Sequence, residues 1–206
     1  RKESSAASDV YKRQDMGPSL FTMPQYVNEL FELFGENPKD HFNYTRKKVL
    51  CNYFWEDGTT LSAKSDPSLF VNEVSQTFNI DPMIIAEYLK KSKLKYDITA
   101  PIFLEKSLHR WATYFSNTTI KALFNIVHLN LFESLNQLNQ RTLKHKKLIQ
   151  FFNRFATYNG SSPYKTPGIM SMIPHLEMGL GTYFPKGGMH EISQSLYRLC
   201  QSKGCL

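Results

Sequence analysis

The chain has 206 residues, of which 41% are hydrophobic and 14% aromatic, and this composition supports a sizeable core and excludes global disorder. Its formal net charge is +7, and no run of about eighteen apolar residues occurs, so the sequence predicts no transmembrane helix. The three cysteines, Cys51, Cys200 and Cys205, have no metal-ligand spacing. Their small, odd number suits a reducing cytoplasm, with Cys51 and Cys200 as small apolar core residues.

A helix and a β-hairpin are predicted first along the chain. Pro24 stands at a first helical position with Thr22 as a candidate N-cap, and Gly35 ends the apolar stripe that follows. Two extended runs, 47–55 and 59–63, flank an Asp-Gly pair, which is a signal for a hairpin turn. Both faces of the first run carry apolar side chains, so we expect the hairpin to be covered on both sides.

Helices dominate the middle of the predicted structure. Asp-Pro pairs at Asp66 and Asp81 each supply an N-cap and a first helical residue, which predicts two consecutive helices. A proline breaks the pattern within residues 96–102, which are interpreted as a loop. A further helical region is predicted from 104 to 158, with an interruption at 116–119.

The last part of the chain is predicted to alternate between loop and short regular elements. Residues 159–168 are loop-like, and 169–175 and 181–184 are short extended candidates. An amphipathic helix is predicted over 189–203, where a glycine ends it.

Positive charge is concentrated in the helical middle. Residues 86–154 hold twelve Lys or Arg against four Asp or Glu. A basic face attracts the phosphates of nucleic acid or of an anionic membrane, and a solvated helical surface has the same composition. Within this region residues 123–135 are apolar nearly all round, which predicts either full burial or contact with lipid.

Two glycine-containing blocks lie near the two ends of the chain, at 15–24 and 183–189. The first reads Asp-Met-Gly-Pro-Ser-Leu-Phe-Thr-Met-Pro, and the second reads Tyr-Phe-Pro-Lys-Gly-Gly-Met. Between them, residues 156–168 read Ala-Thr-Tyr-Asn-Gly-Ser-Ser-Pro-Tyr-Lys-Thr-Pro-Gly. In this order and separation the segments resemble the FAD-dependent carotenoid desaturases of the phytoene desaturase type, within the amine oxidase-like flavoproteins. The resemblance covers residues 15–206.

The glycine-rich turn that holds the pyrophosphate of FAD in such proteins, Gly-x-Gly-x-x-Gly between a strand and a helix, does not occur in the sequence. Gly179 and Gly181 have the first spacing, but Phe184 stands at the third position. We therefore interpret the chain as an internal fragment of a larger, two-domain FAD-binding flavoprotein, and expect it not to hold FAD tightly by itself. The expected fold class is α+β, with a mostly helical substrate- and membrane-facing insertion, a β-hairpin and short strands.

Four parts are expected along the chain. Residues 1–14 have no family likeness and are interpreted as an unrelated or disordered tail. Residues 15–65 would form a flavin-proximal segment with the hairpin, and 66–158 a helical region associated with substrate and membrane. Residues 159–206 would return to the FAD-binding domain, which is truncated.

The resemblance implies two segments beside the flavin. The cofactor-binding candidates are Gly17, Pro18, Ser19, Lys186, Gly187, Gly188 and Met189. Glycine lets a backbone approach a ligand closely, although a plain helix entry uses the same Gly-Gly pair. Lys186 could neutralise negative charge on the reduced flavin or point to solvent.

A carotenoid requires a long apolar tunnel, for which aromatic and methionine side chains are suited. The substrate-binding candidates are Phe21, Met23, Met170, Met172 and Ile173, each of which also suits a plain core. His175 and His190 are nearest the implied active region, as an acid or base or as structural histidines. No catalytic residue and no metal site is assigned from the sequence.

The resemblance implies hydride transfer to FAD from phytoene or a related acyclic carotenoid held in lipid. The enzyme would be cytoplasmic and peripheral to an anionic membrane, with its oligomeric state open, and the fragment alone is expected to be inactive. A desaturase or isomerase for a later, hydroxylated carotenoid remains an alternative. A basic helical nucleic-acid-binding module is another, but no nucleic-acid motif occurs, so no nucleic acid partner is expected.

Overall fold

The computed structural model describes residues 8–9, 12–13, 17, 19–107 and 109–205. The chain divides into two compact units, here called unit 1 (Arg1–Leu50 with Leu180–Leu206) and unit 2 (Cys51–Gly179). Pro18, one of the predicted cofactor residues, lies outside the described residues. The four expected parts divide the chain by role rather than by packing, and that division stays a prediction.

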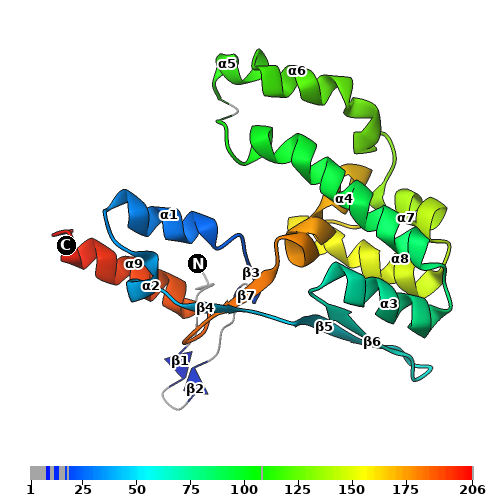
Figure 1. The fold of residues 1–206 in the computed structure, drawn as a ribbon, viewed down its shortest axis with the longest axis horizontal. Helices are drawn as coiled ribbons and strands as arrows, with labels where there is room; N and C mark the ends of the chain where they lie inside the picture. The colour runs from blue at the N-terminus through cyan, green and yellow to red at the C-terminus, as the bar shows by residue number, and fades with distance from the viewer. Residues whose placement is uncertain (1–7, 10–11, 14–16, 18, 108, 206) are drawn as a thin grey trace. The chain divides into compact units, whose positions relative to one another are not determined.

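Unit 1 combines short antiparallel strands with three helices. Its elements are β1 (Ser8–Asp9), β2 (Lys12–Arg13), β3 (Phe21–Thr22), α1 (Gln25–Leu33), α2 (Pro38–His41), β4 (Tyr44–Arg46), β7 (Thr182–Pro185) and α9 (His190–Ser202). β7 lies between β3 and β4 and is antiparallel to both (Figure 1). β1 and β2 pair with each other inside the expected tail, the rest of which lies outside the described residues. The predicted extended run at 181–184 and the final helix are confirmed.

The first predicted helix is confirmed as α1, but its N-terminus differs from the expectation. Thr22 lies in β3 rather than at the cap, and Pro24 occupies the N-cap without a side-chain hydrogen bond. At the other end Gly35 has φ +74°, and the N–H of Glu36 donates to the carbonyl of Phe31. This is the hydrogen bonding of a glycine-ended helix, so the stop signal was predicted correctly.

The core of unit 1 is aromatic. It is formed by Phe21, Phe31, Phe42 and Leu199, all buried. The ring of Phe21 lies 5.7 Å from the rings of Phe42 and Tyr44, edge to face in both cases. Such pairs add about 1 kcal/mol beyond the area that they bury, so β3, β4 and α9 are held together by side-chain packing as well as by backbone bonds.

Unit 2 is mostly helical. Its elements are β5 (Val49–Phe54, of which the first two residues belong to unit 1), β6 (Thr60–Lys64), α3 (Pro67–Phe78), α4 (Pro82–Phe103), α5 (Trp111–Tyr114), α6 (Asn117–Phe124), η1 (Ile126–Leu129), α7 (Leu135–Leu143), α8 (Lys146–Asn153), η2 (Arg154–Asn159), η3 (Gly168–Met172) and η4 (His175–Gly179), the last a π-helix. α4 is the central helix, packed against α3, α6, α7, η3 and η4 (Figure 1). The largest fully buried side chains around it include Phe70, Phe151, Phe152 and Phe155.

The two Asp-Pro helix starts are confirmed. The side chain of Asp66 accepts from the N–H of Leu69, and that of Asp81 accepts from the N–H of Met83. The predicted loop at 96–102 is wrong, because α4 continues through Pro101 to Phe103. Pro101 supplies no backbone N–H, but the helix closes beyond it with the bond from the Leu104 N–H to the Ala100 carbonyl, and the burial of Ala100 and Ile102 favours the helix.

The predicted hairpin is confirmed as β5 and β6, but its expected coverage on both sides is wrong. Leu61 and Ala63 are buried against α3, whereas the side chain of Phe54 is 77% exposed. The predicted helical region 104–158 contains several short helices. The interruption predicted at 116–119 is too long, because Ser116 is the N-cap of α6 and residues 117–119 form its first turn. The extended candidate at 169–175 is wrong, because helical turns form there.

The apolar stretch 123–135 is not fully buried. Leu129 and Leu135 are buried, but Phe124 is 83% and Phe132 is 99% exposed. None of the helices in the described part of the chain combines the length and the apolar character needed to cross a bilayer. Cys200, expected in the core, is exposed because it faces outward on α9.

Candidate functional site

The second glycine block forms a tight turn between β7 and α9 in unit 1. Gly187 and Gly188 have φ of +96° and +92°, a region that residues with a Cβ rarely adopt. The N–H of Gly188 donates to the carbonyl of Pro185, and the N–H of Lys186 donates to the carbonyl of Asn43. The turn is therefore fixed at both ends by backbone hydrogen bonds, and its shape requires glycine.

The structure brings the two glycine blocks together. Phe21 of the first block pairs with Tyr183 of the second through β3 and β7, although they are far apart in the sequence. Gly17, Ser19 and Lys186 are exposed. The remaining cofactor candidate, Met189, is the N-cap of α9 and packs against the aromatic core. Their contact with flavin stays a prediction.

The substrate-binding candidates fall into both units. Phe21 is buried in the core of unit 1, and Met23 follows it with φ +56°. In unit 2 the Thr99 hydroxyl donates to the Met172 sulfur at 3.2 Å, and Ile173 is buried beside it. Met170 lies on η3 and is half-buried. Their role in binding substrate stays a prediction.

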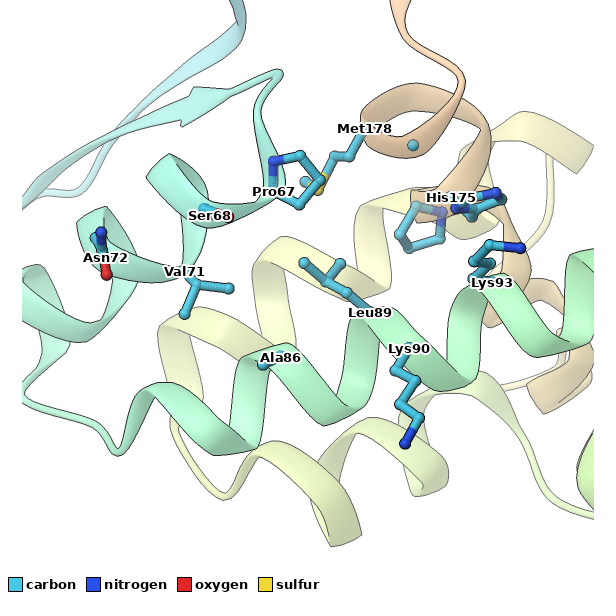
Figure 2. Close-up of a pocket in the computed structure, with 12 residues that line it drawn as sticks. Pro67, Ser68, Val71, Asn72, Ala86, Leu89, Lys90, Lys93, His175 and Met178 are labelled. Atoms are coloured by element: carbon cyan, nitrogen blue, oxygen red, sulfur yellow. The ribbon is translucent and has the colours of Figure 1, made fainter.

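Unit 2 contains a cavity of about 580 Å³ between α3, α4 and η4 (Figure 2). Its lining is Pro67, Ser68, Val71, Asn72, Ala86, Leu89, Lys90, Lys93, Pro174, His175, Met178 and Gly179. Most of these residues present apolar atoms, and the two lysines and the histidine supply the polar edge. A mostly apolar cavity with a few polar groups is the usual form of a binding site for an apolar ligand.

His175 lies at the edge of this cavity, on the π-helix η4. Its backbone N–H donates to the Ser92 hydroxyl, and its ring lies 5.2 Å from the ring of Tyr96. Burial lowers the pKa of His175, and the positive charge of Lys93 lowers it further, while Asp97 opposes this in part. The ring is therefore neutral at physiological pH, so His175 adds no charge to this edge of the cavity.

Below about pH 6.5 the protein should lose stability because His175 must charge in a partly buried place. The unfolded chain binds this proton at the ordinary pKa of 6.5, above that of the folded state, so stability falls as the pH drops through 6.5 toward the lowered folded pKa. The free energy of unfolding is measured with urea at about pH 7.5 and at about pH 5.5. We expect it to fall less between these two pH values in His175→Gln than in the wild type. Burial also lowers the pKa of His145, so part of the fall in stability should remain in the His175→Gln variant. His190→Gln on the exposed start of α9 is the control, and an equal effect of both variants would contradict this assignment.

A second feature missed by sequence reasoning is a buried ion pair beside the cavity. Glu177 is 1% exposed, and its carboxylate accepts from Arg154 at 2.7 Å and from the Tyr158 hydroxyl at 2.5 Å. Burial raises the pKa of Tyr158, and the Glu177 charge raises it further, so the phenol remains protonated. The pair links η2 to η4 and fixes the segment that carries His175.

Comparisons with known proteins agree with the glycine blocks. A model of the family described as flavin containing amine oxidoreductase matches residues 12–205. The chain is 53% identical over 192 residues to 1-hydroxycarotenoid 3,4-desaturase of Flavobacterium sp. (strain P99-3), which covers 93% of the chain and 39% of that protein. It is 26% identical over 192 residues to Phytoene desaturase of Phycomyces blakesleeanus, and the match covers 93% of the chain and 32% of that protein. It is also 26% identical over 196 residues to Hydroxyneurosporene desaturase of Cereibacter sphaeroides, and the match covers 92% of the chain and 38% of that protein. The chain thus spans 32–39% of the length of these relatives.

Proposed function

The chain belongs to the flavin-containing amine oxidoreductases, and from this premise we propose that it is part of an FAD-dependent carotenoid desaturase. The family predicted from the glycine blocks is confirmed. The observation that carries the proposal is the 53% identity to a carotenoid desaturase over 93% of the chain. This identity favours desaturation over an isomerase or a nucleic-acid-binding module.

The glycine turn of unit 1 suits the edge of a flavin. Family membership implies FAD as the cofactor, and the positive φ of Gly187 and Gly188 gives the turn a backbone shape that residues with a Cβ rarely adopt. We assign Lys186, which is exposed beside this turn, to the same contact. Bound FAD supplies the acceptor for the hydride that leaves one substrate carbon while a proton leaves its neighbour, so that a double bond forms.

A 1-hydroxylated acyclic carotenoid is the substrate that we propose. The chain is 53% identical to an enzyme named for such a substrate and 26% identical to a phytoene desaturase. Unit 2 supplies apolar space for a polyene in the cavity beside His175 and in a second one of about 240 Å³, lined by Ile102, Phe103, Tyr114, Thr119, Ala122, Leu123, Ile126, Leu129 and Leu131. These walls bind the chain and exclude water, and neutral His175 adds no charge to them.

Peripheral contact with an anionic membrane is part of the same proposal. Unit 2 exposes many apolar side chains between residues 103 and 132, namely Phe103, Leu104, Trp111, Tyr114, Phe115, Leu123, Phe124, Ile126, Val127, Leu131 and Phe132. Exposed apolar surface of this extent, with Trp and Tyr among basic residues, is typical of a surface that meets lipid. We expect the complete protein to float with anionic vesicles, and its absence from the floating fraction would contradict this contact.

The proposed reaction is tested with the complete reading frame that contains this chain. The FAD-bound protein is incubated in phosphate-free detergent micelles loaded with phytoene or with a 1-hydroxylated acyclic carotenoid, and the visible spectrum is recorded. We expect new long-wavelength polyene bands from the hydroxylated substrate, and none without FAD. Product from phytoene alone would contradict the substrate assignment, and no product from either would contradict the desaturase.

A further inference from the structure

A third cavity in unit 2, of about 610 Å³, lies between α4, η1 and α7. It is lined by Glu87, Lys90, Lys91, Lys93, Leu94, Lys95, Asp97, Val127, His128, Asn130, Leu138, Arg141 and Thr142. Five of these residues are Lys or Arg and two are acidic, so the lining carries a surplus of positive charge. Carotenoid binding makes no use of this charge.

The ion pairs around the cavity leave part of the surplus uncompensated. Lys93 pairs with Asp97 at 2.6 Å. The single carboxylate of Glu87 lies 3.7 Å from Lys91 and 4.0 Å from Lys90, so two ammonium groups share one acid. Arg141 pairs at 2.7 Å with Glu133, which stands behind the lining. Even with Glu133 counted, five cations face three carboxylates.

Among the lining cations, Lys95 has no acidic partner in the described part of the chain. It is 3% exposed, and in the described part of the chain its ammonium makes no ion pair. It donates to the Ser171 hydroxyl at 2.5 Å and to the Gly168 carbonyl at 3.3 Å, which leaves one of its three N–H donors. A buried cation without an anion is costly, so such a group usually faces a partner.

The electrostatic surroundings of Lys95 favour an anion beside it. Burial lowers the pKa of Lys95 to about 8, Glu133 opposes this, and Arg141 and Lys91 lower the pKa further by repulsion. The lining of the cavity thus brings together like charges from α4 and α7, and His128 of η1 also belongs to it. An anion bound there would relieve the repulsion and supply the missing partner.

We propose that this cavity binds a phosphate group, with Lys95 at its base and Lys91 and Arg141 at its rim. A phosphate offers several oxygens to converging ammonium and guanidinium donors, which matches this geometry. The group could belong to free phosphate or to a phospholipid headgroup. Val127, 76% exposed, both lines the cavity and belongs to the apolar surface of residues 103–132, so a headgroup would reach the cavity from lipid beside it.

The test uses the complete, FAD-bound protein at constant ionic strength. Binding of inorganic phosphate is measured by calorimetry, and binding to phosphatidylcholine vesicles with and without phosphatidylglycerol is measured by flotation. The variants are Lys95→Met, which removes the buried charge, and Lys91→Glu, which reverses an exposed charge and leaves the core intact. Lys146→Gln, which removes an exposed charge from α8, is the matched control.

We expect Lys95→Met and Lys91→Glu each to weaken binding by about fivefold or more, and Lys146→Gln by less than about twofold. This pattern with phosphatidylglycerol vesicles identifies a headgroup site, and the same pattern with inorganic phosphate alone identifies a free phosphate site. If wild type binds neither probe, or if the three variants behave alike, the proposal is wrong. If Lys95→Met does not fold, the binding measured for Lys91→Glu against Lys146→Gln tests the proposal by itself. Desaturation in phosphate-free micelles is measured separately, so either proposal can fail alone.

Discussion

Gly188→Val should abolish flavin-dependent activity of the complete enzyme. Gly188 has φ +92°, where a β-branched side chain is strained by about 1–3 kcal/mol. The turn is held by the bond from the Gly188 N–H to Pro185, so it cannot relax without moving the start of α9. We expect desaturation to fall by more than about tenfold and the bound flavin, measured by its absorbance, to fall with it.

Gly204→Val separates backbone strain from a role at the flavin. Gly204 has φ +78° at the end of α9, in the same unit, and its missing Cβ would meet no described atom within 4 Å. This variant carries a similar strain away from the proposed flavin contact. It should lower the free energy of unfolding but retain flavin and activity. If both variants retain full flavin content, the glycine turn is only a helix entry.

Removing one partner of the Arg154–Glu177 pair should strongly destabilise unit 2. Glu177→Gln leaves the guanidinium of Arg154 partly buried without its counter-charge, and the cost of breaking a buried pair is about 3–5 kcal/mol. The Tyr158 hydroxyl would also lose its charged acceptor. Urea unfolding of the complete, FAD-bound protein measures the change in the free energy of unfolding.

Two controls identify the cause of that loss. Glu191→Gln breaks the pair with Arg198 on the exposed side of α9, and we expect it to cost less than about 1 kcal/mol. The double variant Arg154→Met with Glu177→Leu removes both charges together and should recover much of the stability lost in Glu177→Gln. A double variant that is less stable than Glu177→Gln would contradict this explanation, because the loss would then not come from the unpaired charge of Arg154.

Local signals predicted the elements whose ends depend on one or two residues. Asp66 and Asp81 cap their helices through their own side chains, and Gly35 ends α1 through its own φ, so the sequence was sufficient there. The loop predicted at 96–102 was wrong because Pro101 stands in the final turn of a helix that tertiary packing extends. The prediction that the hairpin is covered on both sides was wrong, because a pattern of apolar residues does not show which elements pack against them.

The candidate site was predictable only where the backbone itself is unusual. The adjacent glycines Gly187 and Gly188 indicated a turn with an unusual backbone, and both have positive φ. The pairing of Phe21 with Tyr183 depends on contacts between distant segments, which no short pattern encodes. The Arg154–Glu177 pair and the cavity beside His175 escaped prediction for the same reason, although the buried acid within an apolar stretch was a usable signal.

The order in which the units can assemble on the ribosome follows from the position of β7. Unit 2 is one continuous segment, whereas the central strand of the sheet in unit 1 comes from the far end of the chain. Phe21 leaves the ribosome roughly 10 to 30 s before its partner Tyr183 at ordinary rates of synthesis. During that interval β3 and β4 have unpaired edges, and unit 2 is synthesised before their partner strand β7. The edges of β3 and β4 are therefore open to pairing with other chains until β7 is synthesised.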